Sequence, residues 1–308
     1  MNTLLSIVIA NYNYGRFLEE AIQSVIAQDM GGMLEIIICD AASTDNSVEV
    51  IKKYANGLPP NTSYYNWSKN DPSLATNDQP LTSKITWWCS EKDGGQSAAF
   101  NKGFSHAKGR FLTWLNADDV MLPGTVKALA RAVERWPKCE WLVGGCFWLD
   151  PEMRVIKCFR ARSFSEIRFR TGQVSSWGPS SFFTKRLFNS VGGVDERCHY
   201  TMDGDLWLKF AAIAKVRYKS FINYAWGLRL HENGKMSGHN FTGSGHQSPD
   251  HPKWAQIKKE GKLRKEYFVP TAKRTRWNWF RSIRWLAVIA SRLDTFKYRG
   301  KHYSYAFK

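Results

Sequence analysis

The sequence of 308 residues lacks several features that would define a class of protein. No stretch is long and apolar enough to span a bilayer, which argues against a helical membrane protein. The first ten residues lack the basic start and the cleavage site of a signal peptide, and we expect them to form a strand. No internal repeat is visible. The six cysteines show no close pairing, which favours a cytoplasmic protein with reduced, buried thiols over a disulfide framework or a zinc site.

Acidic residues are scarce relative to basic ones, and the imbalance is local. The chain has 44 Lys and Arg against 27 Asp and Glu, for a formal net charge of +17. Residues 253–308 contain 16 of the basic residues and 3 of the acidic ones, so the first 252 residues carry a net charge of only +4. The positive charge therefore belongs to a C-terminal tail. It points to an anionic surface, either a membrane or a nucleic acid.

Short apolar runs alternate with helical patterns along the chain. The order strand, helix, strand, helix at the start predicts a doubly wound α/β sheet. We expect strands at 4–10, 35–40, 85–89, 110–115, 141–149, 154–159 and within 216–230, and helices at 17–27, 48–54, 96–107, 126–136, 182–191 and 203–214. Residues 57–84 are rich in Pro, Asn, Ser and Asp and are interpreted as an inserted loop, and residues 167–179 as irregular chain.

Two adjacent carboxylates follow one of the predicted strands. Asp118 and Asp119 come just after the run 110–115, which ends in Asn116 and Ala117. Open α/β sheets bind ligands at the carboxyl ends of their strands. Neighbouring carboxylates repel each other, and a divalent metal carrying a phosphorylated ligand would compensate their charge. The alternative is that an acid here caps the helix that follows.

Other polar motifs stand after strands or before helices. Residues 10–12 end the first strand, and Asp40 ends the second. Residues 91–96 contain two glycines before a helix, whose N-terminus favours phosphate. Asp203 and Asp205 begin a later helix. Each feature alone is also explained as a helix cap or a plain turn.

Together and in this order, these motifs resemble those of the family-two inverting nucleotide-sugar glycosyltransferases with the GT-A fold, of the polysaccharide-biosynthesis type. The resemblance covers about residues 4–235. It implies a Rossmann-like, mostly parallel α/β sheet with helices on both faces. The nucleotide-binding half would be 1–119, the acceptor-binding half 120–235, and residues 236–308 a loop and a basic helical tail. The implied activity moves a sugar from a nucleotide-sugar, with a UDP-sugar expected, to a hydroxyl of a saccharide.

The resemblance also implies roles for individual residues. Asp203 takes the position of the catalytic base, and Asp118 that of the motif binding Mg²⁺ or Mn²⁺. His231 matches a late histidine that reaches the metal or the diphosphate in related enzymes. The donor would be held by Ala10, Asn11, Tyr12, Asp40, Asp93, Gly95, Gln96, Asn116, Ala117 and Asp118. Further candidates are Asp119, Asp205 and Lys102.

Three positions depart from the family pattern. Asn116 stands where the first metal-binding carboxylate is usual, Ala41 where a glycine is usual, and Met202 where an acid often precedes the base. A catalytically degenerate, glycosyltransferase-like scaffold is therefore an alternative.

Two other classes of protein fit the sequence less well. The net charge and the 14 tryptophans suggest a nucleic-acid-binding protein, but the charge lies in the tail and no recognised nucleic-acid module is present. A nucleotidyltransferase would have a Gly-rich basic loop after the first strand, where residues 11–15 read Asn-Tyr-Asn-Tyr-Gly.

The tail contains an amphipathic pattern over residues 277–296. A helix there would have one apolar face and one basic face. The apolar face would carry Trp279, Ile283, Leu286, Ala290 and Leu293, and the basic face Arg281, Arg284 and Arg292. Such helices are typical of membrane interfaces, and the alternative is a helix packed on the domain or in an oligomer interface. We therefore expect a peripheral protein on the inner face of the cell membrane, acting on a lipid-linked saccharide in polysaccharide or lipopolysaccharide assembly.

Overall fold

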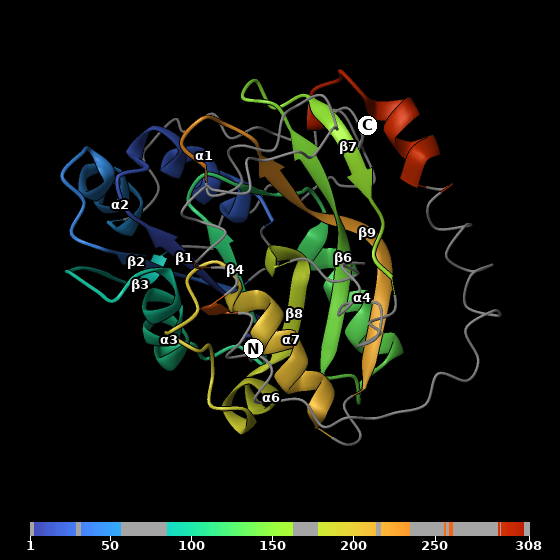
Figure 1. Ribbon diagram of the computed structural model, residues 1–308, viewed down its shortest axis with the longest axis horizontal. Coiled ribbons are helices and arrows are strands. Elements are labelled where there is room, and N and C mark those ends of the chain that lie inside the picture. Colours follow the sequence, from blue (N-terminus) through green and yellow to red (C-terminus); the bar gives the residue numbers. More distant parts are fainter. Residues whose placement is uncertain are drawn as a thin grey trace.

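A computed structural model describes residues 3–28, 32–56, 85–162, 178–213, 217–234, 256, 259–260, 289 and 291–304. Within these residues, nine strands form one sheet in the order β3-β2-β1-β4-β8-β6-β9-β5, with β7 beside β6 (Figure 1). The predicted insertion at 57–84 and the part of the predicted tail helix before residue 289 lie outside the described residues, as does most of 167–179.

The first half of the sheet is parallel, as the alternation of strands and helices predicts. The strands are β1 (Leu5–Asn11), β2 (Leu34–Asp40), β3 (Ile85–Ser90) and β4 (Phe111–Asn116). They pair in parallel, with β1 between β2 and β4. The helices that follow β1, β2 and β3 in the chain are α1 (Gly15–Ile26), α2 (Ser47–Ala55) and α3 (Gln96–His106). Parallel strands end at one edge, so their carboxyl-terminal residues lie near one another.

The second half of the sheet is mixed. Its strands are β5 (Val120–Met121), β6 (Trp141–Leu149), β7 (Val155–Phe159), β8 (Ser181–Thr184) and β9 (Tyr218–Arg229). β8 is antiparallel to β4 and β6, whereas β6 and β9 are parallel, and β6 and β7 form the predicted strand pair. The helices here are α4 (Thr125–Arg135), α6 (Lys185–Ser190) and α7 (Met202–Ala212).

One prediction was wrong: residues 182–184 are strand, not helix. Phe182 and Phe183 lie in β8, and both are fully buried. They belong to different hydrophobic clusters, because successive side chains of a strand point to opposite faces. The helix begins only at Lys185, where the Thr184 hydroxyl accepts a hydrogen bond from the backbone N–H of Leu187. Burial on both faces of the sheet has overridden the local helical pattern.

Helices cover both faces of the sheet. Ile7 and Ile9 of β1 pack in the cluster that contains the apolar sides of α1, α2 and α4. Val8, between them, packs with α3, α6 and α7. This alternation explains why the strands are apolar at nearly every position, and it confirms the predicted α/β architecture.

Stacked tryptophans fix α7 against the sheet. Trp207 of α7 lies between Trp114 of β4 and Trp141 of β6, with ring centroids 5.7 Å and 5.1 Å away. All three side chains are buried. Offset aromatic contacts of this kind add about 1 kcal/mol each to simple burial. The start of α7, which carries Asp203, is therefore held at a defined place beside β4.

The C-terminal residues pack against β7. Arg154 and His302 form an antiparallel bridge, and Tyr303 is buried in the cluster that contains β6 and β7. Residues 291–298 are helical, and this helix lies beside β7 in Figure 1. Arg160 holds the Asp294 carboxylate through two nitrogens, at 2.6 Å and 2.9 Å. In the described part of the chain, no helix is both long and apolar enough to cross a bilayer.

Candidate active site

A cavity of about 790 Å³ opens at the carboxyl ends of the parallel strands. It brings together most of the residues predicted from the sequence. Ten of them line it: Ala10, Asn11, Tyr12, Asp93, Gly95, Gln96, Asn116, Ala117, Asp118 and Asp203. The cavity therefore joins the turns after β1 and β4 to the N-terminal ends of α3 and α7.

Asp118 lines the cavity and contacts His231, which does not line it. The Asp118 Oδ2 and the His231 Nε2 are 3.0 Å apart. His231 is only 7% exposed, and its ring contacts those of Tyr14 and Phe17. It follows the end of β9, whose neighbour β5 begins two residues after Asp118. The sheet pairing thus places two metal-binding side chain types side by side.

These two side chains fit a divalent metal. Two adjacent ligands of an octahedral Mg²⁺ or Mn²⁺, each about 2.1 Å from the ion, are about 3 Å apart. The observed separation of 3.0 Å matches that spacing. The buried His231 Nδ1 has no hydrogen-bond partner among the described residues. One carboxylate and one imidazole leave most of the coordination shell to a diphosphate and water, as is usual for Mg²⁺ at phosphate sites.

Asn116 and Asp119 form a hydrogen-bonded network next to Asp118. The Asn116 Nδ2 donates to the Asp119 Oδ2 at 2.7 Å, and the Asn116 Oδ1 accepts from the Gln96 Nε2 at 2.7 Å. Asp119 is 1% exposed and also accepts from the backbone N–H of Arg229 at 3.0 Å. Burial and the charge of Asp118 raise the pKa of Asp119 well above its ordinary value. Asp119 therefore ties β4 to β9, and it does not line the cavity.

The N-terminus of α3 points into the same cavity. Gly95 precedes the helix with φ +103, a conformation that residues other than glycine rarely adopt. The Asp93 Oδ1 accepts a hydrogen bond from the Gly95 N–H at 2.7 Å and fixes this turn. Free N–H groups at the start of a helix bind phosphate oxygens. The turn before α3 is therefore suited to a diphosphate.

Asp40 lies beside the cavity without lining it. Its side chain is 1% exposed and accepts hydrogen bonds from Asn11, Ser43 and Ser90, the Asn11 Nδ2 at 2.6 Å and the Ser90 Oγ at 2.6 Å. Asn11 in turn lines the cavity. A direct contact of Asp40 with a nucleobase stays a prediction, and it would require Asp40 to give up one of these donors.

Asp203 stands at the first turn of α7 and lines the same cavity as the end of β4. Its Oδ1 accepts a hydrogen bond from the Gly204 N–H at 2.6 Å. The cavity wall on this side also contains His199, Tyr200 and Met202. An acid beside aromatic and polar side chains is a suitable arrangement for a hydroxyl substrate and the base that deprotonates it.

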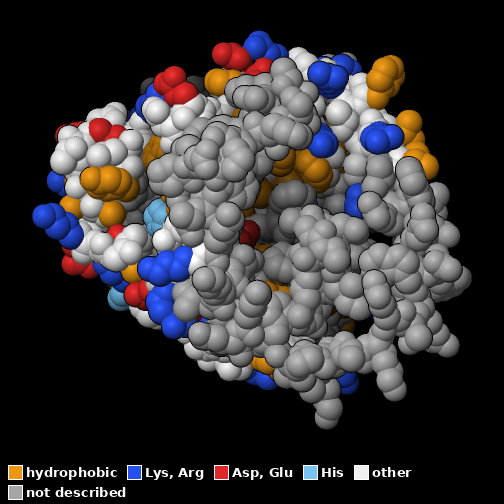
Figure 2. Space-filling view, in the orientation of Figure 1, with side chains coloured by type: hydrophobic (Ala, Val, Ile, Leu, Met, Phe, Trp, Pro, Cys, Tyr) orange, Lys and Arg blue, Asp and Glu red, His pale blue; other side chains and the backbone are white. Residues whose placement is uncertain are grey.

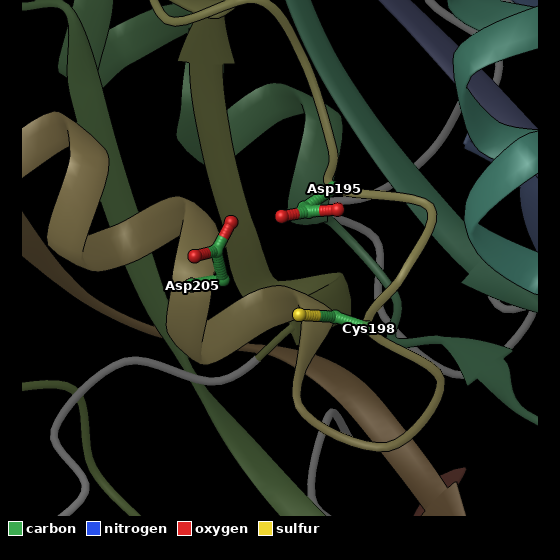
Figure 3. Close-up of side chains that lie close together, drawn as sticks. All are labelled: Asp195, Cys198 and Asp205. Atoms are coloured by element: carbon green, nitrogen blue, oxygen red, sulfur yellow. The ribbon is translucent and has the colours of Figure 1, made fainter. Parts of the chain in front are cut away.

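Asp205 and Lys102 are not part of the cavity lining. Asp205 is fully buried, and its oxygens lie within 4.8 Å of ligand atoms of Asp195 and Cys198 (Figure 3). The Lys209 Nζ is 2.8 Å from the Asp205 Oδ2, and Arg197 pairs with Asp195. Protein cations thus already compensate this cluster, so it is interpreted as structural. Lys102 pairs with Glu91 at 2.9 Å.

Part of the chain matches a known protein family. The family named Glycosyl transferase family 2 matches residues 6–78 and 85–146, which carry β1 to β4 and the acids after β4. The N-terminal part of the chain, less than half of its length, is thus similar to this family. The resemblance stated from the sequence motifs is thereby confirmed.

Individual relatives are distant and longer. An uncharacterized glycosyltransferase of Nostoc sp. is 34% identical over 130 residues, which cover 42% of this chain and 33% of the relative. The chondroitin synthase of Pasteurella multocida is 24% identical over 223 residues, which cover 72% of this chain and 20% of the synthase. The chain thus spans a third or less of the length of these two relatives.

A solved structure shows the same fold. The crystal structure of residues 1–349 of S. aureus TarS in complex with UDP-GlcNAc matches with a TM-score of 0.54 and 15% identity. The match covers 85% of this chain and 66% of that chain. The predicted GT-A fold is thereby confirmed.

Several residues of the cavity wall were not predicted from the sequence. Tyr14, Trp114, His199, Tyr200 and Trp226 all line it. Tyr14 lies two residues beyond the motif after β1, so its place could have been found from the chain order. Trp114 and Trp226 lie in apolar stretches of β4 and β9 that resemble ordinary core, and His199 and Tyr200 lie in the polar chain before α7, where no motif marks them.

Proposed function

We propose that this glycosyltransferase moves a sugar from a nucleotide-sugar to a hydroxyl of a saccharide acceptor and inverts the anomeric centre. The observation that carries the proposal is the single cavity lined by Asp118 at the end of β4 and by Asp203 at the start of α7. A carboxylate suited to the diphosphate and a carboxylate suited to the acceptor hydroxyl thus face one space. A UDP-sugar is the proposed donor, supported by the fold shared with TarS, whose structure contains UDP-GlcNAc.

The donor half of the cavity would bind the nucleoside diphosphate. The turns after β1 and β2 would hold the nucleoside, and the N–H groups at the start of α3 would receive phosphate oxygens. Asp118 and His231 would hold Mg²⁺ or Mn²⁺. When bound, such an ion neutralises negative charge on the diphosphate leaving group. The role of Asn116 would be to orient Gln96 and Asp119 without adding a further negative charge.

The acceptor half would supply the base. Asp203 would accept the proton of the acceptor hydroxyl as its oxygen attacks the anomeric carbon, while the bond to the diphosphate breaks. A single displacement from the face opposite the leaving group inverts the centre. No nucleophilic side chain is needed for such a displacement.

A donor screen tests the proposal. We expect a UDP-sugar with Mn²⁺ to raise the melting temperature by about 5 °C at a hundred times its Kd, because a ligand of the folded state stabilises it by about 2.7 kcal/mol. Other sugar nucleotides in the same buffer, and the same UDP-sugar in EDTA, serve as controls. Release of UDP should follow in the presence of an acceptor. If no sugar nucleotide shifts the melting temperature or is turned over, a degenerate scaffold is the better account.

We further propose that the C-terminal helix places the enzyme on an anionic membrane, where a lipid-linked saccharide would be the acceptor. The helix at 291–298 packs on the protein with polar groups: the Ser291, Asp294 and Thr295 side chains bond to residues 158–160. Leu293 and Phe296 of this helix, and Ile289 before it, face outward, whereas Tyr298 packs against the cluster that contains β6 and β7. Ile289 is 47%, Leu293 64% and Phe296 90% exposed.

This outward face has the composition of a membrane-binding surface. Positions 289, 293 and 296 are spaced by four and three residues, so they form one stripe along a helix. Exposed basic residues flank the stripe: Arg292, Lys297, Arg299 and Lys301. Figure 2 shows hydrophobic and Lys or Arg side chains together over this part of the molecule. Each such cation near an anionic bilayer contributes about 1 kcal/mol to binding.

Vesicle flotation tests the membrane proposal. The double variant Leu293→Ser, Phe296→Ser should bind anionic vesicles at least tenfold more weakly than the wild type, because the interface then buries two fewer apolar side chains. The matched control Phe296→Leu keeps the apolar surface and should bind nearly as well. Point variants are preferable to removing residues 253–308, because that deletion also removes the buried Glu260 and Tyr303. Equal flotation of all three proteins would contradict the proposal.

A further inference from the structure

A buried carboxylate from the tail contacts the chain that leads into α7. Glu260 is 0% exposed. Its Oε1 accepts from the backbone N–H of His199 at 2.9 Å, and its Oε2 accepts from the backbone N–H of Tyr200 at 3.0 Å and from the Thr201 hydroxyl at 2.7 Å. The Gln256 Nε2 donates to the Glu260 Oε1 at 3.0 Å. A residue from the basic tail thus collects four donors, three of them from successive residues of one loop.

These contacts engage the side chain that would ordinarily cap α7. Thr201 is the N-cap residue of α7, yet its side chain makes no capping hydrogen bond to the helix. Its hydroxyl donates to Glu260 instead. A negative charge at a helix N-terminus also interacts favourably with the helix dipole. Burial alone would raise the pKa of Glu260, but the hydrogen bonds outweigh it and the pKa lies below its ordinary value. The carboxylate is therefore ionised in the folded protein at neutral pH.

The loop that Glu260 holds forms one wall of the active-site cavity. His199 and Tyr200 line the cavity, and Asp203 follows within two residues of Thr201. A Cβ atom at position 95 would lie 3.8 Å from the His199 Nδ1, so this loop reaches across to the N-terminus of α3. A shift of the loop would move the proposed base relative to the donor, whereas Asp118 and His231 follow β4 and β9 and do not belong to this loop.

We propose that Glu260 is a positioning residue for transfer: it holds the loop 199–201 so that Asp203 and the acceptor wall face the bound donor. This inference rests on the proposed function. It assigns the tail a part in catalysis that is separate from membrane binding, since Glu260 contacts the loop before α7 and the helix at 291–298 contacts β7. Glu260 acts through Asp203 and touches no substrate itself.

Kinetics of the full chain test the proposal. Glu260→Gln is nearly isosteric but replaces one acceptor oxygen with an NH₂ group that faces other donors. We expect kcat to fall by about 10- to 100-fold, the range for small misplacement of a catalytic group, while UDP affinity by calorimetry changes less than about threefold. Glu49→Gln, at an exposed acid of α2, is the matched control and should behave as wild type. Unchanged kcat in Glu260→Gln, or a loss of UDP affinity as large as the loss of kcat, would overturn the proposal.

Chemical rescue distinguishes positioning from a general loss of folding. Glu260→Ala leaves a space the size of acetate beside the unpaired N–H groups, so sodium acetate should restore nucleotide release several-fold, and sodium chloride at equal ionic strength should not. If Glu260→Ala does not fold, Thr201→Val serves as the second variant. It removes only one of the four contacts of Glu260 and should lower kcat by a smaller factor than Glu260→Gln does. A folded Glu260→Ala protein that acetate leaves unchanged, or a fully active Thr201→Val protein, would count against the role.

Amide hydrogen exchange tests the contact without requiring turnover. In the wild type the amides of His199 and Tyr200 should be protected, and in Glu260→Ala they should exchange at least about tenfold faster while those of α1 do not change. Unprotected amides in the wild type would refute the inference even if the enzyme is active. Conversely, a wild type with protected amides and no nucleotide release from any donor would refute the proposed function and leave the contact established.

Discussion

The variant Asp203→Asn is expected to bind donor normally and to turn over at least about 100-fold more slowly, the usual scale for loss of a general base. Asparagine keeps the oxygen that accepts from the Gly204 N–H at 2.6 Å, so the first turn of α7 should stay in place. It lacks the basicity to accept the proton of an acceptor hydroxyl. Single-turnover measurements with saturating UDP-sugar would separate this loss from any change in product release.

The controls for this variant come from the same part of the chain. Glu196→Gln changes an exposed acid on the loop before α7, and it should keep nearly full turnover. UDP affinity should agree within about threefold among the three proteins, because the proposed function assigns Asp203 to the acceptor hydroxyl and not to the diphosphate. Near-normal turnover of Asp203→Asn would remove the assignment of Asp203 as base, even if the chain is an active glycosyltransferase.

The sequence patterns predicted the donor half of the molecule well. β1, β2 and β4 are continuous apolar runs, as strands buried on both faces of a parallel sheet require, whereas β3 is a less buried strand at the edge of the sheet. Once those strands are placed in parallel, their carboxyl ends must lie at one edge, which brings residues 10–12 and 116–118 to one cavity. Local periodicity and one topological rule are sufficient for this part.

The second half depended on contacts that no local pattern reveals. Phe182 and Phe183 look like the start of the helix that follows, and only their burial on opposite faces of the sheet makes them a strand. The two residues of β5 are too few to form a pattern, yet their pairing with Gly227 and Trp226 carries His231 to Asp118. Long-range pairing decided both cases.

The tail shows the same limit for function. Its amphipathic helix was predicted, but which face packs on the protein could not be. The described part packs through Asp294 and its partner Arg160, and the stripe that contains Leu293 and Phe296 stays exposed. In the sequence, Glu260 stands among lysines, and no pattern marks it as a buried residue. Its burial against residues 199–201 appears only in three dimensions.

Asp118→Asn is expected to abolish the dependence of donor binding on a divalent ion. In the wild type, UDP should bind about 100-fold more tightly with Mn²⁺ than in EDTA, since the ion links Asp118 to the diphosphate. In the variant the two affinities should become nearly equal, because a neutral amide is a much weaker ligand than a carboxylate. For His231→Gln, the ratio of UDP affinity with Mn²⁺ to that in EDTA should fall about tenfold, to a value between those of the wild type and Asp118→Asn, because the Asp118 ligand remains.

The ratio of the two UDP affinities is the decisive quantity, because Asp118 also has a structural contact. The Asp118 Oδ2 lies 3.0 Å from the His231 Nε2, so both variants could lower the melting temperature simply by breaking that pair. A purely structural pair would change the affinities with Mn²⁺ and with EDTA by the same factor and leave their ratio near the wild-type value. A metal-binding pair must lower the ratio, and Asp118→Asn must lower it further than His231→Gln. Calorimetric titration of UDP into the three proteins therefore separates a metal site from an ordinary hydrogen bond between β4 and β9.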